Sequence, residues 1–255
     1  MLAKAATLGA DEVIVDLEDG VAADAKTTAR KNLGLAGALG TLAIRINGLR
    51  SPWWRDDLAA VADVQPDVVV VPKVESPDDV STVAALLPSG IGLEVQIETA
   101  RGLVEAERIA AADAPLEALV FGPGDFAASL GVPLLTIGAG SWEYALARIS
   151  VAAHAYGLQA VDGPFADLHD LDGLRRTATL ALAHGFDGKW VVHPDQIAPV
   201  NEVFTATATQ VERARRILAA GDGAVRVEGE MVDAATKRLA EAVLARTTGG
   251  VPPSS

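Results

Sequence analysis

Two acidic residues, Glu98 and Asp125, each follow an apolar stretch that is typical of a β-strand. The first stretch covers 92–97 and the second 118–121, and a helical pattern of apolar residues lies between them. Two parallel strands joined by a helix form a right-handed unit, so both carboxylates leave neighbouring strands at the same end. Converging carboxylates suit Mg²⁺, which takes a few protein oxygens and keeps positions for a substrate. We therefore predict that Glu98 and Asp125 bind Mg²⁺.

Further polar residues stand where the other predicted strands end, which is where α/β barrels carry their active sites. They are Asp16, Glu18, Asp19, Arg45, Asn47, Lys73, Asp162 and His193. Arg45 is the natural clamp for a substrate carboxylate, because its planar fork donates two parallel hydrogen bonds. We expect Glu18 and Asp19 to orient metal-bound water and Lys73 to support the metal site.

The glycine-rich turn of Gly122, Pro123 and Gly124 brings bare backbone next to the predicted metal site. Its N–H groups, except at Pro123, are candidate donors to a substrate oxygen. A Mg²⁺ ion beside them would chelate a 2-oxo acid and stabilise the alkoxide or enolate formed when a neighbouring C–C bond breaks. This chemistry is that of a lyase or an aldolase.

Each of these residues also has a plainer interpretation. A single carboxylate at a strand end usually caps a helix or is solvated, which applies to Glu18 and Asp19. Lys73 can simply pair with a surface acid. His193 precedes a proline, and the pattern favours a rigid turn over a catalytic base. Asp233, taken alone, is a helix N-cap.

The elements that must position these residues are strands alternating with helical patterns, which is the rhythm of an α/β barrel. The predicted strands are 12–16, 41–46, 67–71, 92–97, 118–121, 158–161 and 188–192. One more strand before Met1 would close a TIM (β/α)8-type barrel, so we expect that this chain lacks the first strand. The expected division is a barrel (strands 2 to 8) over 1–198, C-terminal helices and a lid over 199–246, and a disordered tail over 247–255.

Composition narrows the class of protein. A chain of 255 residues is the usual length of one α/β barrel. The 34 acidic and 21 basic residues give a net charge of −13, which argues against nucleic acid as a partner. The absence of cysteine excludes disulfides and thiolate metal sites. No apolar run has the length of a membrane span, and no signal-peptide pattern opens the chain. We expect a cytoplasmic protein.

The motifs together resemble a known family. They are Asp16-Leu17-Glu18-Asp19-Gly20-Val21, Arg45-Ile46-Asn47, Pro72-Lys73, Ile97-Glu98-Thr99, Phe121-Gly122-Pro123-Gly124-Asp125 and Lys189-Trp190-Val191-Val192-His193-Pro194-Asp195-Gln196. Their order and spacing are similar to those of citrate lyase beta-subunit-like proteins in the HpcH/HpaI aldolase/citrate lyase superfamily, which includes malyl-CoA and citramalyl-CoA lyases. The resemblance covers Met1 to about Arg246.

The resemblance implies a TIM barrel with Mg²⁺ on Glu98 and Asp125, and with Arg45 holding the carboxylate of a 2-oxo acid. The stretch 229–233 resembles a C-terminal lid motif, whose aspartate, here Asp233, acts as acid/base in a neighbouring subunit of a homotrimer. The implied reaction is the cleavage or formation of a malyl-, citramalyl- or citryl-type acyl-CoA thioester, giving a 2-oxo acid and an acyl-CoA. The same site would serve the synthase direction or thioester hydrolysis.

Two features depart from the family pattern. The opening strand, of the type Arg-Ser-x-Leu-x-Val-Pro, is missing, together with an arginine expected near the acyl-CoA. Close relatives often carry Glu where this chain has Gly124. Two rival functions remain open: a class II 2-oxo-acid (pyruvate) aldolase that works without CoA, and an inactive or structural subunit.

Overall fold

The fold is built on a curled, seven-stranded parallel sheet in a computed structural model that describes residues 5, 7–36, 40–221 and 223–247. The strands lie side by side in chain order, and each pairs in parallel with the next. They are β1 (Glu12–Asp16), β2 (Thr41–Arg45), β3 (Val68–Val71), β4 (Gly92–Ile97), β5 (Leu116–Phe121), β6 (Gln159–Asp162) and β7 (Gly188–Lys189). Within these described ranges no strand pairs β7 with β1, so the sheet is an open part of a barrel.

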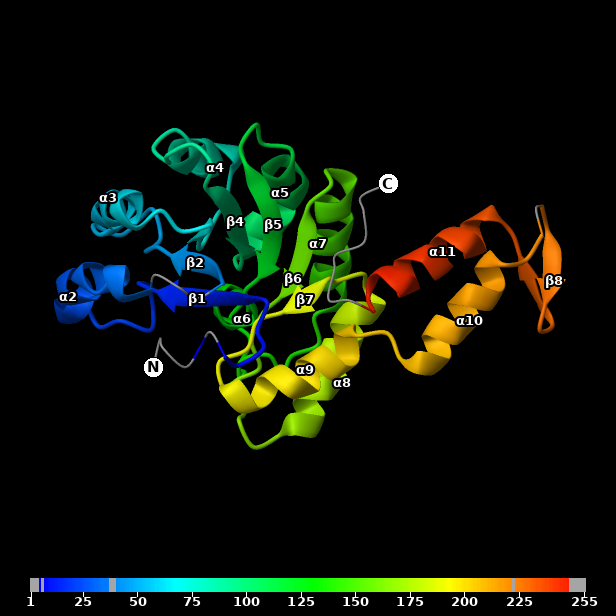
Figure 1. The fold of residues 1–255 in the computed structure, drawn as a ribbon. Helices are drawn as coiled ribbons and strands as arrows, with labels where there is room; N and C mark the ends of the chain where they lie inside the picture. Colours follow the sequence, from blue (N-terminus) through cyan, green and yellow to red (C-terminus); the bar gives the residue numbers. More distant parts are fainter. Residues whose placement is uncertain (1–4, 6, 37–39, 222, 248–255) are drawn as a thin grey trace.

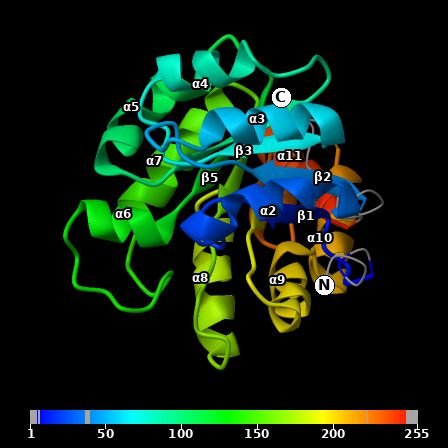
Figure 2. The same cartoon turned by 90° about the vertical axis from the view of Figure 1, so that its left-hand side faces the viewer.

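Helices connect successive strands and cover the outer side of the sheet (Figures 1 and 2). The α-helices up to the last barrel strand are α2 (Lys26–Lys31), α3 (Trp54–Val64), α4 (Pro77–Ala84), α5 (Ala100–Ala110), α6 (Pro123–Ser129), α7 (Glu143–Ala155) and α8 (Leu171–Ala183). Short 3-10 turns add η1 (Ala23–Ala25), η2 (Leu33–Ala36) and η3 (Pro194–Gln196). The predicted α/β barrel-type fold is confirmed, because parallel strands alternate with covering helices throughout this part.

The core between sheet and helices consists of branched aliphatic side chains, as the low aromatic content requires. The four valines of β3 are all buried, because both faces of a parallel strand are covered. On β4, Leu93, Val95 and Ile97 pack in this outer core. Side chains alternate along a strand, so Glu94 and Gln96 face the inside of the curled sheet.

The inner face has its own small apolar layer of Ala43, Val68 and Val70, with Ile14 and Trp190 packed against it. The strand that we predicted over 188–192 is shorter, because only 188–189 pair with β6. Trp190 N–H still donates to the carbonyl of Asp162, which extends the contact by one residue.

The C-terminal part leaves the sheet after α9 (Ile197–Phe204), which packs on α8 through Val200 and Leu174. The predicted division at 198/199 thus falls inside α9. Beyond it, α10 (Ala208–Leu218), β8 (Val225–Val227), β9 (Glu230–Val232) and α11 (Ala234–Ala245) form an arm that extends away from the strands (Figure 1). Of the tail predicted as disordered, 248–255 lie outside the described residues.

The hairpin β8–β9 is a difference from the sequence prediction, which gave only helices and a lid over 199–246. Glu228 and Gly229 form the two-residue turn with φ of 50° and 92°. Two successive positive φ values are those of the tight hairpin turns whose twist matches that of the strands. No helix among the described residues is long and apolar enough to cross a membrane.

Candidate active site

The predicted site residues converge at the carboxyl ends of β1 to β5. Glu18 follows β1, Arg45 ends β2, Lys73 follows β3, Glu98 follows β4 and Asp125 follows β5. Ion pairs link several of them: Lys73 Nζ lies 2.6 Å from Glu18 and 3.1 Å from Asp125, and Arg45 lies 3.1 Å from Glu18. Six of the predicted residues, counting Asp19 at 3.5 Å from Lys73, therefore form one cluster through contacts or shared partners.

Glu98 is the buried carboxylate of this cluster, with 2 % of its surface exposed. Its Oε1 accepts from Lys73 N–H at 2.8 Å and its Oε2 from Gln96 Nε2 at 3.2 Å. Burial raises the pKa of Glu98 to about 8, and the nearby Glu18 carboxylate adds to the rise. A Cβ on Gly122 would lie 2.2 Å from Glu98 Oε2, so only glycine leaves room for this carboxylate.

Lys73 reaches the cluster with both its main chain and its side chain. Its φ is +54°, in the left-handed region that costs a residue with a Cβ roughly 1 kcal/mol. This conformation directs the N–H at Glu98 while the ammonium lies between Glu18, Asp125 and Asp19. Burial lowers the pKa of Lys73, but the hydrogen bond and charge of Glu18 outweigh it, so the pKa lies above its ordinary value.

Hydrogen bonds to neighbouring side chains orient the Arg45 guanidinium. Its Nε and Nη2 donate to the two oxygens of Asp16 at 2.8 and 2.7 Å. Its Nη1 donates to Gln96 Oε1 at 3.4 Å. The Trp190 ring lies 6.0 Å from its guanidinium carbon. Asp16 thus fixes one edge of the fork, and the Nη1 side faces Glu18 and the inside of the barrel.

The loop that carries Glu18 is anchored by buried hydrogen bonds. Lys26 Nζ donates to the carbonyls of Leu17 and Glu18, both at 2.7 Å. Asn47 Nδ2 also donates to Leu17, and Asp57, fully buried, accepts from both nitrogens of Asn47. Buried polar groups of this kind are costly unless paired, and here they fix the loop geometry.

Gly122 precedes α6, and Pro123, Gly124 and Asp125 form its first turn, which the sequence had indicated only as a glycine-rich turn. Pro123 suits the first helical position, where no N–H is needed. The next N–H groups of a helix have no partner within it, so those of Gly124 and Asp125 point out of the helix start. The Ile137 side chain covers Gly124, since an added Cβ would lie 3.3 Å from it.

A metal ion fits the donor set of this cluster. Glu98 and Asp125 supply carboxylate oxygens, which are the ligands that Mg²⁺ prefers. Glu18 Oε2 is buried and has no hydrogen-bond donor, because the nearby Nη1 of Arg45 is not aligned with it. The part of the chain that the structure describes holds no group of three His, Cys, Asp or Glu side chains arranged for a metal. The site therefore suits an ion that completes its shell with water and substrate.

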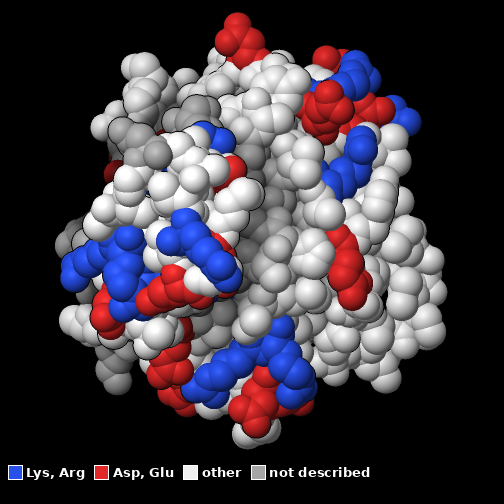
Figure 3. All heavy atoms as spheres, turned by 90° about the vertical axis from the view of Figure 1, so that its right-hand side faces the viewer, with Lys and Arg blue, Asp and Glu red and all other residues white. Residues whose placement is uncertain are grey.

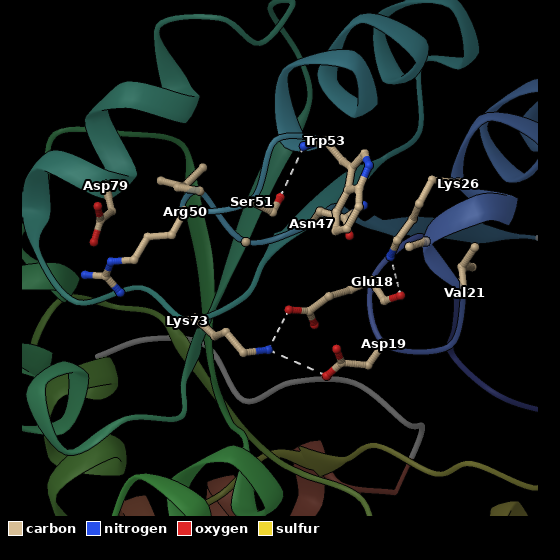
Figure 4. A pocket seen from close by; sticks show the side chains of 13 residues that line it. Glu18, Asp19, Val21, Lys26, Asn47, Arg50, Ser51, Trp53, Lys73 and Asp79 are labelled. Carbon is tan, nitrogen blue, oxygen red and sulfur yellow. Dashed lines mark hydrogen bonds and ion pairs between the residues drawn. The ribbon is translucent and has the colours of Figure 1, made fainter.

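A cavity of about 390 Å³ opens beside the cluster (Figure 4). Glu18, Asp19 and Lys73 form one wall, and Trp53 with Lys26 forms another. Arg50 and Asp79 line a further side. The cluster thus reaches a space of the size of a small organic ligand through Glu18, Asp19 and Lys73, whereas Glu98, Asp125 and Arg45 are not among the residues that line it.

Two residues considered in the sequence lie apart from the cluster. Asp233 is the N-cap of α11, where its side chain accepts from Thr236 N–H at 3.0 Å, and these hydrogen bonds lower its pKa. Among the described residues no hydrogen bond or ion pair links it to the cluster, and α11 begins at the outer end of the arm (Figure 1). His193 Nδ1 accepts from Asp195 N–H, which is the rigid turn that we favoured.

Gln96 is a site residue that the sequence reading missed. It connects Arg45 to Glu98 through its two amide atoms. The signal was present, since Glu94, Gln96 and Glu98 follow one another at the two-residue period of one strand face. Asp16 was noted only as a strand-end residue, and its two-pronged grip on Arg45 was not foreseen.

Comparison with known proteins agrees with this geometry. The family model described as HpcH/HpaI aldolase/citrate lyase matches residues 1–194. An L-malyl-CoA/beta-methylmalyl-CoA lyase from Cereibacter sphaeroides is 38 % identical over 281 residues, covering 94 % of this chain and 88 % of the relative. A (3S)-malyl-CoA thioesterase from the same species is also 38 % identical, over 91 % of this chain and 85 % of the relative.

Solved structures of CitE from Mycobacterium tuberculosis share the fold. One, in complex with magnesium, acetoacetate and coenzyme A, has a TM-score of 0.85 and 36 % identity, covering 96 % of this chain and 92 % of that one. A citrate lyase beta subunit with oxaloacetate and magnesium, from the same organism, has a TM-score of 0.71 and 35 % identity over 79 % and 90 % of the two chains. The motif-based assignment is confirmed: this chain belongs to the HpcH/HpaI aldolase/citrate lyase family.

Proposed function

We propose that this chain is a Mg²⁺-dependent carbon–carbon lyase that cleaves, or in reverse forms, a malyl-, citramalyl- or citryl-type acyl-CoA thioester. The observation that carries the proposal is the convergence of Glu98, Asp125 and Arg45 at the carboxyl ends of the strands, in a cluster that reaches an open cavity through Glu18, Asp19 and Lys73. Relatives named as malyl-CoA lyases support the reaction class. Related structures that hold magnesium together with keto acids support the ion.

In this proposal Glu98 and Asp125 hold Mg²⁺, and bound Mg²⁺ supplies a Lewis acid for the oxygen that gains charge as the C–C bond breaks. Arg45 binds the carboxylate of the 2-oxo acid from its Nη1 side, while Asp16 keeps the guanidinium oriented. Gln96 fixes the side chains of Arg45 and Glu98 relative to each other, because it hydrogen-bonds to both. The open N–H groups of Gly124 and Asp125 donate to a substrate oxygen.

Asp233 has a separate part in the proposal, as the acid/base supplied by a neighbouring copy in a trimer. Its position at the outer end of the arm supports a reach beyond its own barrel (Figure 1). Its low pKa means that it enters as a carboxylate and therefore as a base. To act, it must exchange the Thr236 hydrogen bonds for the substrate. The cytoplasmic location that we expected remains a prediction.

A thioester panel assayed with and without Mg²⁺ tests the reaction. Malyl-, citramalyl- and citryl-CoA are incubated with the protein, and both the 2-oxo acid and the free CoA thiol are measured. A lyase releases 2-oxo acid without free thiol. Release of free thiol would favour the second candidate, hydrolysis, which the thioesterase relative supports. Turnover of free hydroxy-oxo acids without CoA would point to an aldolase, and no turnover of any of these would contradict the proposal.

Mixing two inactive variants tests the shared site. Asp233→Asn loses the acid/base, which is worth roughly 10²–10⁴-fold in rate, and Glu98→Gln loses a metal ligand. In mixed oligomers some barrels with intact Glu98 receive an intact arm, so we expect part of the activity to return. The control is Asp233→Asn alone, taken through the same mixing procedure, and it stays inactive. Absence of recovery after demonstrated subunit exchange would contradict the shared site: Asp233 would then act within its own chain or serve only as a helix cap.

A further inference from the structure

Lys73 combines three unusual features at the point where the metal ligands meet. Its backbone adopts φ of +54° although it is not glycine. Its N–H is bound to Glu98, and its ammonium lies 3.1 Å from Asp125, so one residue contacts both proposed ligands. Strained backbone that is held in place in this way is concentrated at functional sites.

The position of the ammonium is that of a counter-cation. Nζ lies between Glu18 at 2.6 Å, Asp125 at 3.1 Å and Asp19 at 3.5 Å (Figure 4 shows the first and third of these contacts). Three carboxylates so close together repel one another in the absence of a positive charge. Among the described residues, this ammonium is the only hydrogen-bonding or ionic partner of the Asp125 carboxylate.

We propose that Lys73 is a resident cation that occupies Asp125 in the metal-free protein and is displaced from it when Mg²⁺ binds. This inference rests on the proposed function, because it takes Glu98 and Asp125 as the metal ligands. The main-chain contact to Glu98 persists, so Glu98 stays in place while Asp125 changes partner. The ammonium retains Glu18, whose contact is shorter.

Two consequences follow. The carboxylates remain assembled without metal, since Lys73 offsets their mutual repulsion. Metal binding must break the Lys73–Asp125 contact, so Lys73 weakens the apparent Mg²⁺ affinity and keeps the ion exchangeable. The residue therefore acts by positioning and competition.

Calorimetric titration of Mg²⁺ into wild type and Lys73→Met, without substrate and in about 0.5 M KCl, tests the exchange. The salt screens long-range attraction, with a Debye length of about 4 Å, and leaves short contacts in place. We expect Mg²⁺ to bind Lys73→Met about 3- to 10-fold more tightly, which corresponds to the loss of one competing ion pair. Equal or weaker binding would overturn the proposal. Lys73→Gln, similar in length, serves if the methionine variant does not fold.

Arg50→Met is the matched control. Arg50 lines the same cavity and is positively charged, but its partner is Glu75 rather than a cluster carboxylate. Its removal should leave the Mg²⁺ affinity within about twofold. A gain equal to that of Lys73→Met would mean that net charge alone sets the affinity, and would overturn the exchange.

Thermal unfolding gives a second readout that is independent of activity. Metal-free Lys73→Met should melt below metal-free wild type, and saturating Mg²⁺ should raise its Tm by more than it raises that of wild type. If Glu98→Gln binds Mg²⁺ as wild type does, the proposed function has failed. If Glu98→Gln loses Mg²⁺ and Lys73→Met does not bind it more tightly, only the Lys73 inference has failed.

Discussion

Two acidic groups lie at opposite ends of the inner side of the sheet, and β4 contributes to both. At the carboxyl end, the charges of Glu18 and Asp125 act on Glu98. Toward the amino end, Glu94 meets Glu12 and Glu117, whose charges act on it. Burial raises the pKa of Glu98 to about 8 and that of Glu94 to about 8 as well.

The two groups differ in what compensates their charge. At the carboxyl end, Lys73 and Arg45 contact the carboxylates, and donors are aimed at both oxygens of Glu98. At the amino end, the structure records no Lys or Arg against Glu12, Glu94 or Glu117 within its described ranges, and Glu94 Oε2 lacks a hydrogen bond. A displaced pKa and burial are therefore common to both ends. Oriented donors and an adjoining cavity distinguish the candidate active site.

On the face of the molecule that carries the arm, surface charge gives no comparable signal. On the side of the molecule from which the arm projects, basic and acidic side chains lie next to one another in mixed groups (Figure 3). Pairs such as Arg213 with Glu230 and Arg216 with Glu228 account for part of this pattern on the arm. Exposed pairs of this kind contribute little to stability.

The largest effect should come from Gly122→Ala. The added Cβ would lie 2.2 Å from Glu98 Oε2 and 2.4 Å from Glu98 Cβ, so the carboxylate must move. A displacement of about 1 Å at a reacting site costs on the order of 10²-fold, and we expect at least that loss in lyase turnover. Gly188→Ala is the matched control, because nothing lies within 4 Å of its added Cβ. Wild-type turnover in Gly122→Ala would contradict the geometry.

Arg45→Lys should have the next largest effect. An ammonium cannot reproduce the fork that pairs with Asp16 while also presenting Nη1 to a substrate carboxylate. We expect 2-oxo acid binding to weaken by about 10- to 100-fold, at roughly 1.5–3 kcal/mol for each lost charged hydrogen bond, with Mg²⁺ binding retained. Titration of pyruvate, glyoxylate and oxaloacetate checks this, with Arg213→Lys, on the arm, as control. Unchanged affinity would make Arg45 structural.

A smaller effect, on stability rather than activity, should distinguish the amino end. The folded pKa of Glu94 lies at about 8, above its ordinary value of 4.5, so the folded protein holds a proton that the unfolded chain releases. Stability therefore falls as pH rises from about 4.5 through 8. Glu94→Gln removes this loss. We expect the difference in free energy of unfolding between Glu94→Gln and wild type to shift in favour of the variant by about 1–3 kcal/mol from pH 5 to pH 9.

Denaturant unfolding at the two pH values measures this difference. Glu107→Gln, on the exposed side of α5, is a suitable control because it removes one acid of the same type without touching the inner group. A pH dependence that is the same in Glu94→Gln and wild type would show that the amino-end group does not hold the proton.

The sequence was sufficient for most of the barrel, because buried parallel strands such as 68–71 are continuous apolar runs between helical patterns. It also placed Glu98 and Asp125 on neighbouring strands. The strand at 188–192 was overestimated, since Trp190 and Val191 pack on apolar clusters outside the strand ladder and Val192 is exposed. The hairpin β8–β9 was missed, because its turn uses Glu228 with positive φ where asparagine or glycine is usual.

Side-chain partnerships were the part that the sequence did not reveal. The binding of Arg45 by Asp16 depends on the β1–β2 register, which pairs these two residues directly. The roles of Lys73 depend on a left-handed backbone that no residue type at that position indicates. Gln96 was not predicted as a site residue because the strand around it is mostly apolar, although two glutamates lie on the same face.

The most direct test of the account compares Glu98→Gln with Glu94→Gln in Mg²⁺ titrations by calorimetry. Both variants make the same change on the same face of β4, both residues are buried, and each has a pKa raised to about 8. If the carboxyl end is the metal site, Glu98→Gln loses Mg²⁺ binding by at least roughly 100-fold, since it loses an anionic ligand, while Glu94→Gln binds as wild type does. Retained binding in Glu98→Gln, or equal loss in both variants, would contradict the central claim.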